Sequence, residues 1–285
     1  MIKLPPWIVL DPLLHHWLLE DIGRGDRSTQ GLQLAQNGKA VWVAKERGII
    51  AGLTLASRIF YLLEPTTIFT PLIADGETAE KGQMIAEIEG PLECLLMGER
   101  AALNIVMRLS GIATLTRKYV EVMADLSTQL VDTRKTTPGL RILEKYAVQV
   151  GGAVNHRMGL DDAVMIKDNH ILAAGSITNA IAQLRYSIPY PLTIEVETSN
   201  FSQVAEAIAS GANTIMLDNM TLEEMKRAVE LIRREKPHID IEASGNITLD
   251  NLRLVAKTGV DYISSSAPVT RSTWLDLSMR LIPLE

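Results

Sequence analysis

The second half of the chain carries six short apolar segments, and each of them runs directly into charged or hydroxyl-bearing residues. These polar ends lie at residues 132–135, 167–168, 195–197, 218–219, 242–245 and 264–266. If the segments are parallel strands, their ends meet at one face of an α/β barrel, which is where such barrels assemble their active sites. Contact with solvent explains any single polar end, but six in series predict a shared site.

The positive charges of this set favour an anionic ligand. They are Arg134, Lys135, Arg157 and Lys167, with His156 next to Arg157. Arginine binds carboxylates and phosphates through a planar fork, whereas lysine acts as a point charge. Several cations that converge on one site therefore predict a ligand with more than one negative charge.

The acids of the set favour a divalent cation. They are Glu195, Glu197, Asp218 and Glu242. Carboxylates on neighbouring strands can hold Mg²⁺, which usually keeps waters and bridges to substrate phosphates or hydroxyls. The structural alternative is that acids and bases pair with each other at the rim of the barrel.

Small residues end the last two segments, at 244–246 and 264–266. They allow backbone N–H groups to approach a phosphate, and barrels frequently bind phosphate at their final strands. The residues alone thus predict a barrel enzyme for a phosphorylated sugar and a second anionic substrate, with Mg²⁺. A Schiff-base aldolase remains an alternative, because Lys135 or Lys167 could be its nucleophile.

Helix-like stretches separate most of the six segments, at residues 140–150, 202–210, 222–235 and 249–258. Strands that alternate with helices predict βαβ units and a parallel sheet. The first half differs. Residues 38–90 have the short apolar runs and glycine breaks of strands, with a helical stretch at 57–63, and residues 94–119 keep helical spacing.

The opening helix is predicted from its first residues. Asp11 is a good N-cap and Pro12 suits the first helical position, so the helix is expected to start there and to run to Ile22.

Length and composition suit a globular enzyme. The 285 residues are enough for one α/β barrel or two smaller domains, and 47% apolar residues argue against disorder. A net charge of −6 gives no reason to expect nucleic acid or a membrane as partner. Cys94 is the single cysteine, and prolines interrupt the apolar N-terminus before it resembles a signal peptide. A cytoplasmic protein is expected.

Several motifs together resemble the quinolinate phosphoribosyltransferase family, also called nicotinate-nucleotide pyrophosphorylase (carboxylating). In the family's order they are EDIGRGDRST, GERAALNIVMRLSGIAT, DTRKTTPGLRILEKYAVQVGGAVNHRMGLDDAVMIKDNHI, IEVE, IMLDNM and IEASGNI. The resemblance runs from about Leu10 to the C-terminus.

This resemblance implies an α/β protein with an N-terminal α/β sandwich domain, residues 1–112, and an incomplete, six- to seven-stranded α/β barrel, residues 113–272. It implies a last helix at about 273–285 that returns to the first domain, and a homodimer in which one subunit's N-terminal domain covers the other's barrel. The implied reaction joins quinolinate to 5-phosphoribosyl-1-pyrophosphate (PRPP) with Mg²⁺. It gives nicotinate mononucleotide, a precursor of NAD, and releases pyrophosphate and CO₂.

The resemblance also implies roles for individual residues. Arg100 would reach in from the partner subunit to a quinolinate carboxylate. Glu197 and Asp218 would hold Mg²⁺ and the ribose hydroxyls, and with Lys135 and Lys167 they are the implied catalytic residues. The implied substrate-binding set is Arg100, Thr133, Arg134, Lys135, His156, Arg157, Lys167, Glu197, Asp218, Ser244, Gly245, Asn246, Ser264, Ser265 and Ser266.

Two positions depart from the family pattern. Many members have glycine where Ser266 stands and histidine where Thr270 stands. The added bulk of Ser266 raises a question about the fine geometry of the predicted phosphate loop. Three alternative functions fit the same residues. They are a related transferase that uses nicotinate, the Schiff-base lyase, and a barrel that only binds a phosphosugar.

Neighbouring side chains on a strand point to opposite sides. Arg134 and Lys135 are therefore not expected to bind one group in the same way. We expect a division of labour, in which one cation serves the acceptor's carboxylates and the other lies nearer the ribosyl centre and pyrophosphate.

Overall fold

The computed structural model describes residues 3–32, 34 and 36–283, and the chain divides into two compact units. The first contains Met1–Arg117, Ile142–Gly152 and Ser272–Glu285, and the second contains Lys118–Arg141 and Ala153–Arg271. No helix in the described part of the chain has a stretch long and apolar enough to cross a bilayer.

The first unit is built on a four-stranded antiparallel sheet with the order β12-β1-β5-β3. The strands are β1 (Asn37–Ala44), β3 (Ile68–Pro71), β5 (Met84–Pro91) and β12 (Leu277–Ile282); β2 (Gly48–Ile49) pairs with β4 (Thr78–Ala79). Its helices are α1 (Trp7–Ile22), α2 (Arg27–Leu32) and α3 (Leu53–Leu63), with most of α4 (Leu92–Val122) and α5 (Arg141–Gly151). Buried Trp42 and Phe60 form its aromatic core with Phe69.

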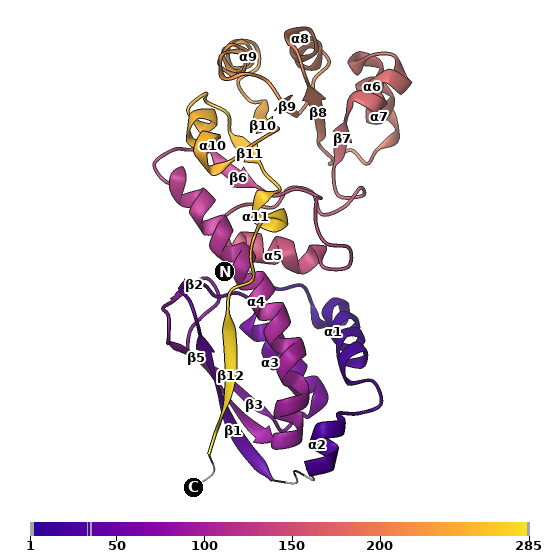
Figure 1. Cartoon of the computed structure of the whole chain (residues 1–285). Coiled ribbons are helices and arrows are strands. Elements are labelled where there is room, and N and C mark those ends of the chain that lie inside the picture. The colour runs from indigo at the N-terminus through magenta and orange to yellow at the C-terminus, as the bar shows by residue number, and fades with distance from the viewer. Residues whose placement is uncertain (1–2, 33, 35, 284–285) are drawn as a thin grey trace. The chain divides into compact units, whose positions relative to one another are not determined.

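The predicted C-terminal helix is wrong, because residues 277–282 form strand β12, which lies alongside β1 in Figure 1. In the segment LSMRLI, apolar and polar residues alternate over the first four positions, which is the two-residue period of a strand. Pairing with β1 satisfies the hydrogen-bonding groups of an edge that would otherwise be open.

The predicted start of the first helix is also wrong. The helix begins at Trp7, before Asp11, and Pro12 lies inside it. Leu10, Leu14 and Leu18 are spaced by one turn and are all buried, so packing of this face outweighs the hydrogen bond lost at the proline.

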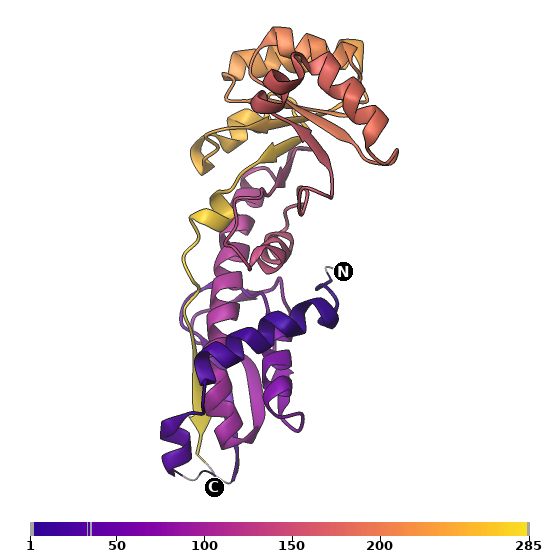
Figure 2. The same cartoon turned by 90° about the vertical axis from the view of Figure 1, so that its right-hand side faces the viewer.

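The second unit is a parallel sheet of six strands with the order β6-β11-β10-β9-β8-β7, as predicted. The strands are β6 (Gln129–Val131), β7 (Val164–Ile166), β8 (Ile194–Thr198), β9 (Thr214–Asp218), β10 (Asp240–Ser244) and β11 (Tyr262–Ser264). The helices are α6 (Asp168–Ala174), α7 (Ile177–Ser187), α8 (Phe201–Ala209), α9 (Leu222–Glu235), α10 (Leu249–Ala256) and α11 (Ala267–Thr270). In Figures 1 and 2, α7 to α10 cover one face of this sheet.

The sheet is an incomplete barrel. Strands β6 and β7 stand at its two ends, and in the described residues the free edge of β6 carries only an isolated parallel bridge from Val131 to Val154. Central strands such as β8 are buried along most of their length, which explains their continuous apolar sequence. Because all six strands run in the same direction, their polar carboxyl ends meet at one edge.

Candidate active site

A cavity of about 690 Å³ lies at the carboxyl end of the parallel sheet. Every residue of the second unit that the resemblance implies for substrate binding lines it, whereas Glu195, one of the four predicted acids, does not. The implied residues that line it are Thr133, Arg134, Lys135, His156, Arg157, Lys167, Glu197, Asp218, Ser244, Gly245, Asn246, Ser264, Ser265 and Ser266. Residues whose segments are separated by more than one hundred positions thus share one cavity.

Arg100 is the one residue of the implied substrate-binding set that does not line this cavity. It lies on α4, its side chain is 60% exposed, and its nearest acid is Glu99, with Nη2 and Oε1 3.9 Å apart. A separation of that size on an exposed helix holds the guanidinium weakly.

The loop after β6 brings Arg134 and Lys135 to the same cavity, so the expectation that they lie on a strand is wrong, whereas their division of labour stays a prediction. Strand β6 ends at Val131, and the chain bends at Arg134. The hydroxyl of Thr133 accepts a hydrogen bond from the Lys135 N–H at 3.0 Å, which turns the backbone. Strand alternation therefore does not apply beyond Val131.

Arg134 and Arg157 lie close together in the cavity. Burial lowers the pKa of Arg157, and the charge of Arg134 lowers it further, although Glu195 acts in the opposite direction. Arg157 is anchored by a hydrogen bond of 2.8 Å from Nη1 to the carbonyl of Ala163. Neither guanidinium has an ion-pair partner among the described residues. Two adjacent guanidiniums favour a ligand with two anionic groups.

Lys167 and Glu197 form an ion pair from the ends of neighbouring strands. The alternative in which acids and bases pair at the rim therefore holds for this pair. Glu197 also lies beside the next strand, β9, which ends in Asp218. The carboxylate of Asp218 accepts a hydrogen bond of 2.7 Å from the side chain of Asn219. Glu197 and Asp218 thus present oxygen atoms of the kind that Mg²⁺ binds.

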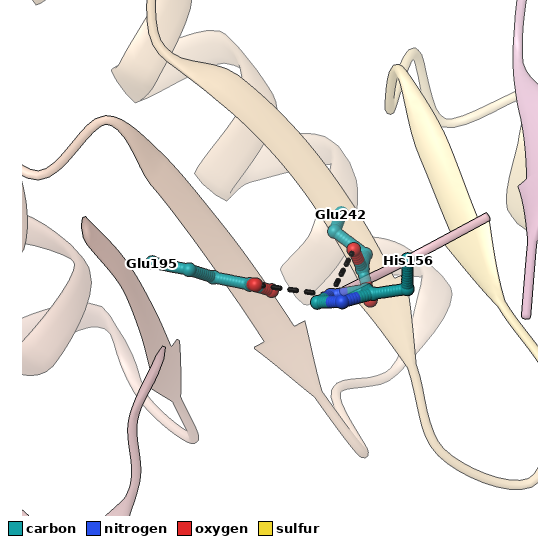
Figure 3. A group of neighbouring side chains, drawn as sticks. All are labelled: His156, Glu195 and Glu242. Atoms are coloured by element: carbon teal, nitrogen blue, oxygen red, sulfur yellow. Dashed lines mark ion pairs between the residues drawn. The ribbon is translucent and has the colours of Figure 1, made fainter. Parts of the chain in front are cut away.

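A second group of charges lies deeper in the sheet, where His156 points at Glu195 and Glu242 (Figure 3). Its Nε2 atom is 3.0 Å from Oε2 of Glu195 and 3.5 Å from Oε2 of Glu242. Burial disfavours the charged ring, but the hydrogen bonds to both carboxylates outweigh it and raise the pKa of His156 to about 10. The backbone N–H of Arg157 approaches Nδ1 to 2.7 Å and opposes that rise, because a second ring N–H would face it.

These contacts fit an ion-pair network better than a metal site. The three residues offer ligand atoms within 4.8 Å of one another. A metal would need the lone pair of Nε2 and would move the ring proton to Nδ1, where the Arg157 N–H already points. The same contacts occupy both ring nitrogens, so His156 faces the cavity without a free nitrogen. Its implied role as a direct substrate ligand stays a prediction.

The turn after β10 has a backbone that only glycine suits. Gly245 has φ of +97°, and a Cβ there would lie 2.2 Å from Oδ1 of Asn219. Asn219 and Asn246 also have positive φ. These left-handed residues bring the main chain itself to the cavity surface.

The serine at position 266 fits without strain. Its φ and ψ, −84° and −14°, lie in the right-handed helical region that any residue adopts. Its carbonyl accepts a hydrogen bond of 3.0 Å from the hydroxyl of Thr270. The departure from the family's glycine therefore needs no special backbone conformation.

Three polar residues of the cavity had no predicted role. Asp132 and Asn219 belong to the predicted strand ends 132–135 and 218–219, and both line the cavity. Asp132 is buried and accepts a hydrogen bond of 2.8 Å from the backbone N–H of His156. Arg271 lies outside the predicted ends. It is the first charged residue after Asp261, which precedes β11, and this position in the sequence was the available signal.

Known proteins match the chain along its length. Residues 26–110 match the model of the quinolinate phosphoribosyl transferase N-terminal domain, and residues 112–280 match that of the C-terminal domain. A probable nicotinate-nucleotide pyrophosphorylase [carboxylating] from Synechocystis sp. is 62% identical, with 99% of this chain and 96% of that protein covered. One from Bacillus subtilis is 46% identical, covering 95% and 92%.

A solved structure agrees with these matches. The crystal structure of NadC from Streptococcus pyogenes is 40% identical and has a TM-score of 0.94, with 99% of this chain and 100% of that chain covered. Two domain models, full-length relatives and the fold thus give the same result. The chain belongs to the quinolinate phosphoribosyltransferase family.

Proposed function

We propose that this cavity transfers the phosphoribosyl group of PRPP to quinolinate and releases pyrophosphate and CO₂, which gives nicotinate mononucleotide for NAD synthesis. The observation that carries the proposal is a group of three cations that have no ion-pair partner in the described part of the chain and share one cavity with strand-end acids and small residues. They are Arg134, Lys135 and Arg157. The family of the chain is consistent with this reaction.

The acceptor binds at the guanidiniums. Quinolinate has two carboxylates, and Arg134 with Arg157 offers two forks close together. An acceptor with one carboxylate, such as nicotinate, leaves one of these cations without a partner in a partly buried site. That loss costs on the order of a few kcal/mol.

The acids act on the ribosyl group. Glu197 and Asp218 face the cavity and would stabilise the positive charge that develops on the ribose carbon as pyrophosphate leaves. The same two carboxylates would hold Mg²⁺, which when bound supplies positive charge for pyrophosphate. Lys135 and Lys167 add positive charge on the protein side. The residues mainly position two anionic substrates, so no covalent nucleophile is required.

The small residues bind the ribose 5-phosphate. Ser244, Gly245 and Asn246 follow β10, and Ser264 to Ser266 end β11, which is the neighbouring strand. The positive φ of Gly245 brings main-chain N–H groups to the surface that phosphate would contact.

Arg100 acts from the partner subunit of a homodimer. It is exposed on α4 and does not line the cavity of its own chain, which is what a residue donated to another subunit requires. Mixing Arg100→Ala with Lys135→Ala subunits should restore part of the activity in hybrid dimers. No recovery in a mixture shown to exchange subunits would argue against a shared site.

The proposed domains are residues 1–112 with the C-terminal segment, and residues 113–272 as the catalytic domain. The two compact units divide the chain in a similar way but assign residues 142–152 to the first unit. A cytoplasmic location is part of the proposal, in keeping with one buried free cysteine, Cys94.

The test is the full product balance. Purified protein with quinolinate, PRPP and Mg²⁺ should release equal amounts of pyrophosphate and CO₂ and form nicotinate mononucleotide. PRPP binding without pyrophosphate release would point to a phosphosugar-binding protein. Borohydride trapping of a lysine with a carbonyl substrate would point to the Schiff-base lyase.

A further inference from the structure

One cation of the cavity has no place in the reaction as described above. Arg271 follows α11 directly and lines the cavity. Within the described residues, its guanidinium has neither a hydrogen bond nor an ion pair. An arginine that is held at a cavity without an acid beside it favours an anionic ligand.

The surroundings of Arg271 narrow the choice of ligand. Strands β10 and β11 and the loops after them contribute eleven cavity residues, and Arg271 is the one cation among them. The one acid, Glu242, lies 3.5 Å from His156. The eleven are Glu242, Ser244, Gly245, Asn246, Ile247, Ser264, Ser265, Ser266, Ala267, Thr270 and Arg271. The other cavity cations come from the loop after β6, the segment before β7 and the end of β7.

The hydroxyls of this sector are partly committed to the protein. Ser265 accepts a hydrogen bond from the Ala267 N–H at 3.2 Å, and Thr270 donates to the Ser266 carbonyl at 3.0 Å. Neutral groups alone compensate poorly for a phosphate dianion, whereas one guanidinium supplies both charge and several donors. Arg271 therefore supplies the positive charge that the other cavity residues of this sector do not offer a phosphate.

The side chain of Arg271 is exposed. Tyr119 is buried, and burial raises the pKa of its hydroxyl, while the positive charge of Arg271 acts in the opposite direction. The guanidinium therefore lies within electrostatic range of Tyr119, and its exposed donors are accessible to a ligand in the cavity.

We infer that Arg271 is the cation that binds the 5-phosphate of the phosphoribosyl substrate. The inference rests on the proposed function and adds to it a specific residue for one substrate group. Arg134 and Arg157 then serve the acceptor, and Arg271 serves the phosphate monoester.

The test compares two phosphate probes on three variants. Ribose 5-phosphate carries the monoester without the pyrophosphate, and inorganic pyrophosphate carries the other group alone. Arg271→Gln should weaken ribose 5-phosphate binding and raise KM for PRPP by about 10- to 100-fold, with KM for quinolinate changed by less than about threefold. Arg271→Lys should recover part of the affinity. Arg234→Gln, which changes an exposed arginine of α9 that pairs with Glu235, should match the wild type.

The outcomes separate the two proposals. Unchanged ribose 5-phosphate binding in Arg271→Gln overturns the inference while the proposed function stands. Loss of pyrophosphate binding with ribose 5-phosphate retained also overturns it. A wild-type protein that binds neither PRPP nor ribose 5-phosphate overturns the proposed function and the inference with it. Thermal unfolding of each variant excludes misfolding as the cause.

Discussion

Two groups of charges in the parallel-sheet unit differ in how they are neutralised. Arg134, Lys135 and Arg157 face the cavity without ion-pair partners among the described residues. His156, by contrast, is held between two buried carboxylates. Several like charges without partners around one cavity are expected where an anionic ligand binds, whereas a buried charge must have partners in the protein itself. The first group should therefore govern turnover, and the second should govern stability.

The largest effect is expected when a cation of the first group is removed. Arg134→Ala and Lys135→Ala should each lower kcat/KM by at least about 10²- to 10³-fold, because charge on the substrates loses its partner. Both residues follow the end of β6 and lie outside the core, so thermal unfolding should change little. Steady-state kinetics and calorimetry check the two halves of the prediction. Near-wild-type turnover in either variant would refute the assignment of the cavity.

Two acids of β8 give a sharper form of the same comparison. Glu195 and Glu197 are two positions apart on one strand and share a face, but Glu195 belongs to the buried network and Glu197 faces the cavity. Glu195→Gln should lower the free energy of unfolding by about 1–3 kcal/mol, because a buried charged hydrogen bond is lost. Glu197→Gln should instead lower turnover and leave stability nearly unchanged.

Urea unfolding and steady-state kinetics on both variants test whether Glu195→Gln loses stability and Glu197→Gln loses turnover. The comparison fails if Glu195→Gln is as stable as the wild type, or if Glu197→Gln loses stability and keeps its activity.

The turn after β10 offers a smaller effect with a matched control. Gly245→Ala combines positive φ with a Cβ 2.2 Å from Asn219, so it should cost about 1–3 kcal/mol and raise KM for PRPP. Gly211→Ala also has positive φ, but no atom lies within 4 Å of its Cβ. It should cost about 1 kcal/mol and leave KM unchanged. Equal KM values for PRPP in the two variants would show that the turn at Gly245 does not bind the phosphate.

The pH dependence of stability probes the buried network with the smallest effect. The pKa of His156 is raised in the folded protein, up to about 10 from an ordinary 6.5. Its stabilising contribution is therefore complete below about pH 6.5 and is lost as the pH rises through the folded value. His156→Gln should be less stable than the wild type at pH 6, and the difference should shrink toward pH 10. A difference that is constant with pH would show that the ring is neutral throughout.

The parallel sheet was predictable from the sequence because its strands are buried, continuous apolar runs with polar ends. All six predicted strands form, and the residues at their ends meet. What could not be predicted depends on contacts between distant segments. The segment from Leu277 to Ile282 forms a strand because β1 offers it an edge, and α1 starts early because Leu10 is buried on the same helix face as Leu14 and Leu18.

The same reason applies within the site. The presence of cations and acids was evident from the sequence, but their pairing was not. His156 contacts Glu195 and Glu242 because these two side chains, one on β8 and one on β10, point toward the same place. No local sequence pattern shows this. Arg271 was not predicted because it lies beyond the end of β11, and only the short helix α11 brings it to the cavity.

The central claim is that the unpaired cations are matched to an acceptor with two carboxylates. The most direct test is the ratio of kcat/KM for quinolinate and nicotinate, each measured with saturating PRPP and Mg²⁺ on the wild-type protein. An acceptor that leaves a cation unpaired should be disfavoured, so quinolinate should be preferred by at least about 100-fold. Equal values, or a preference for nicotinate, would contradict the account.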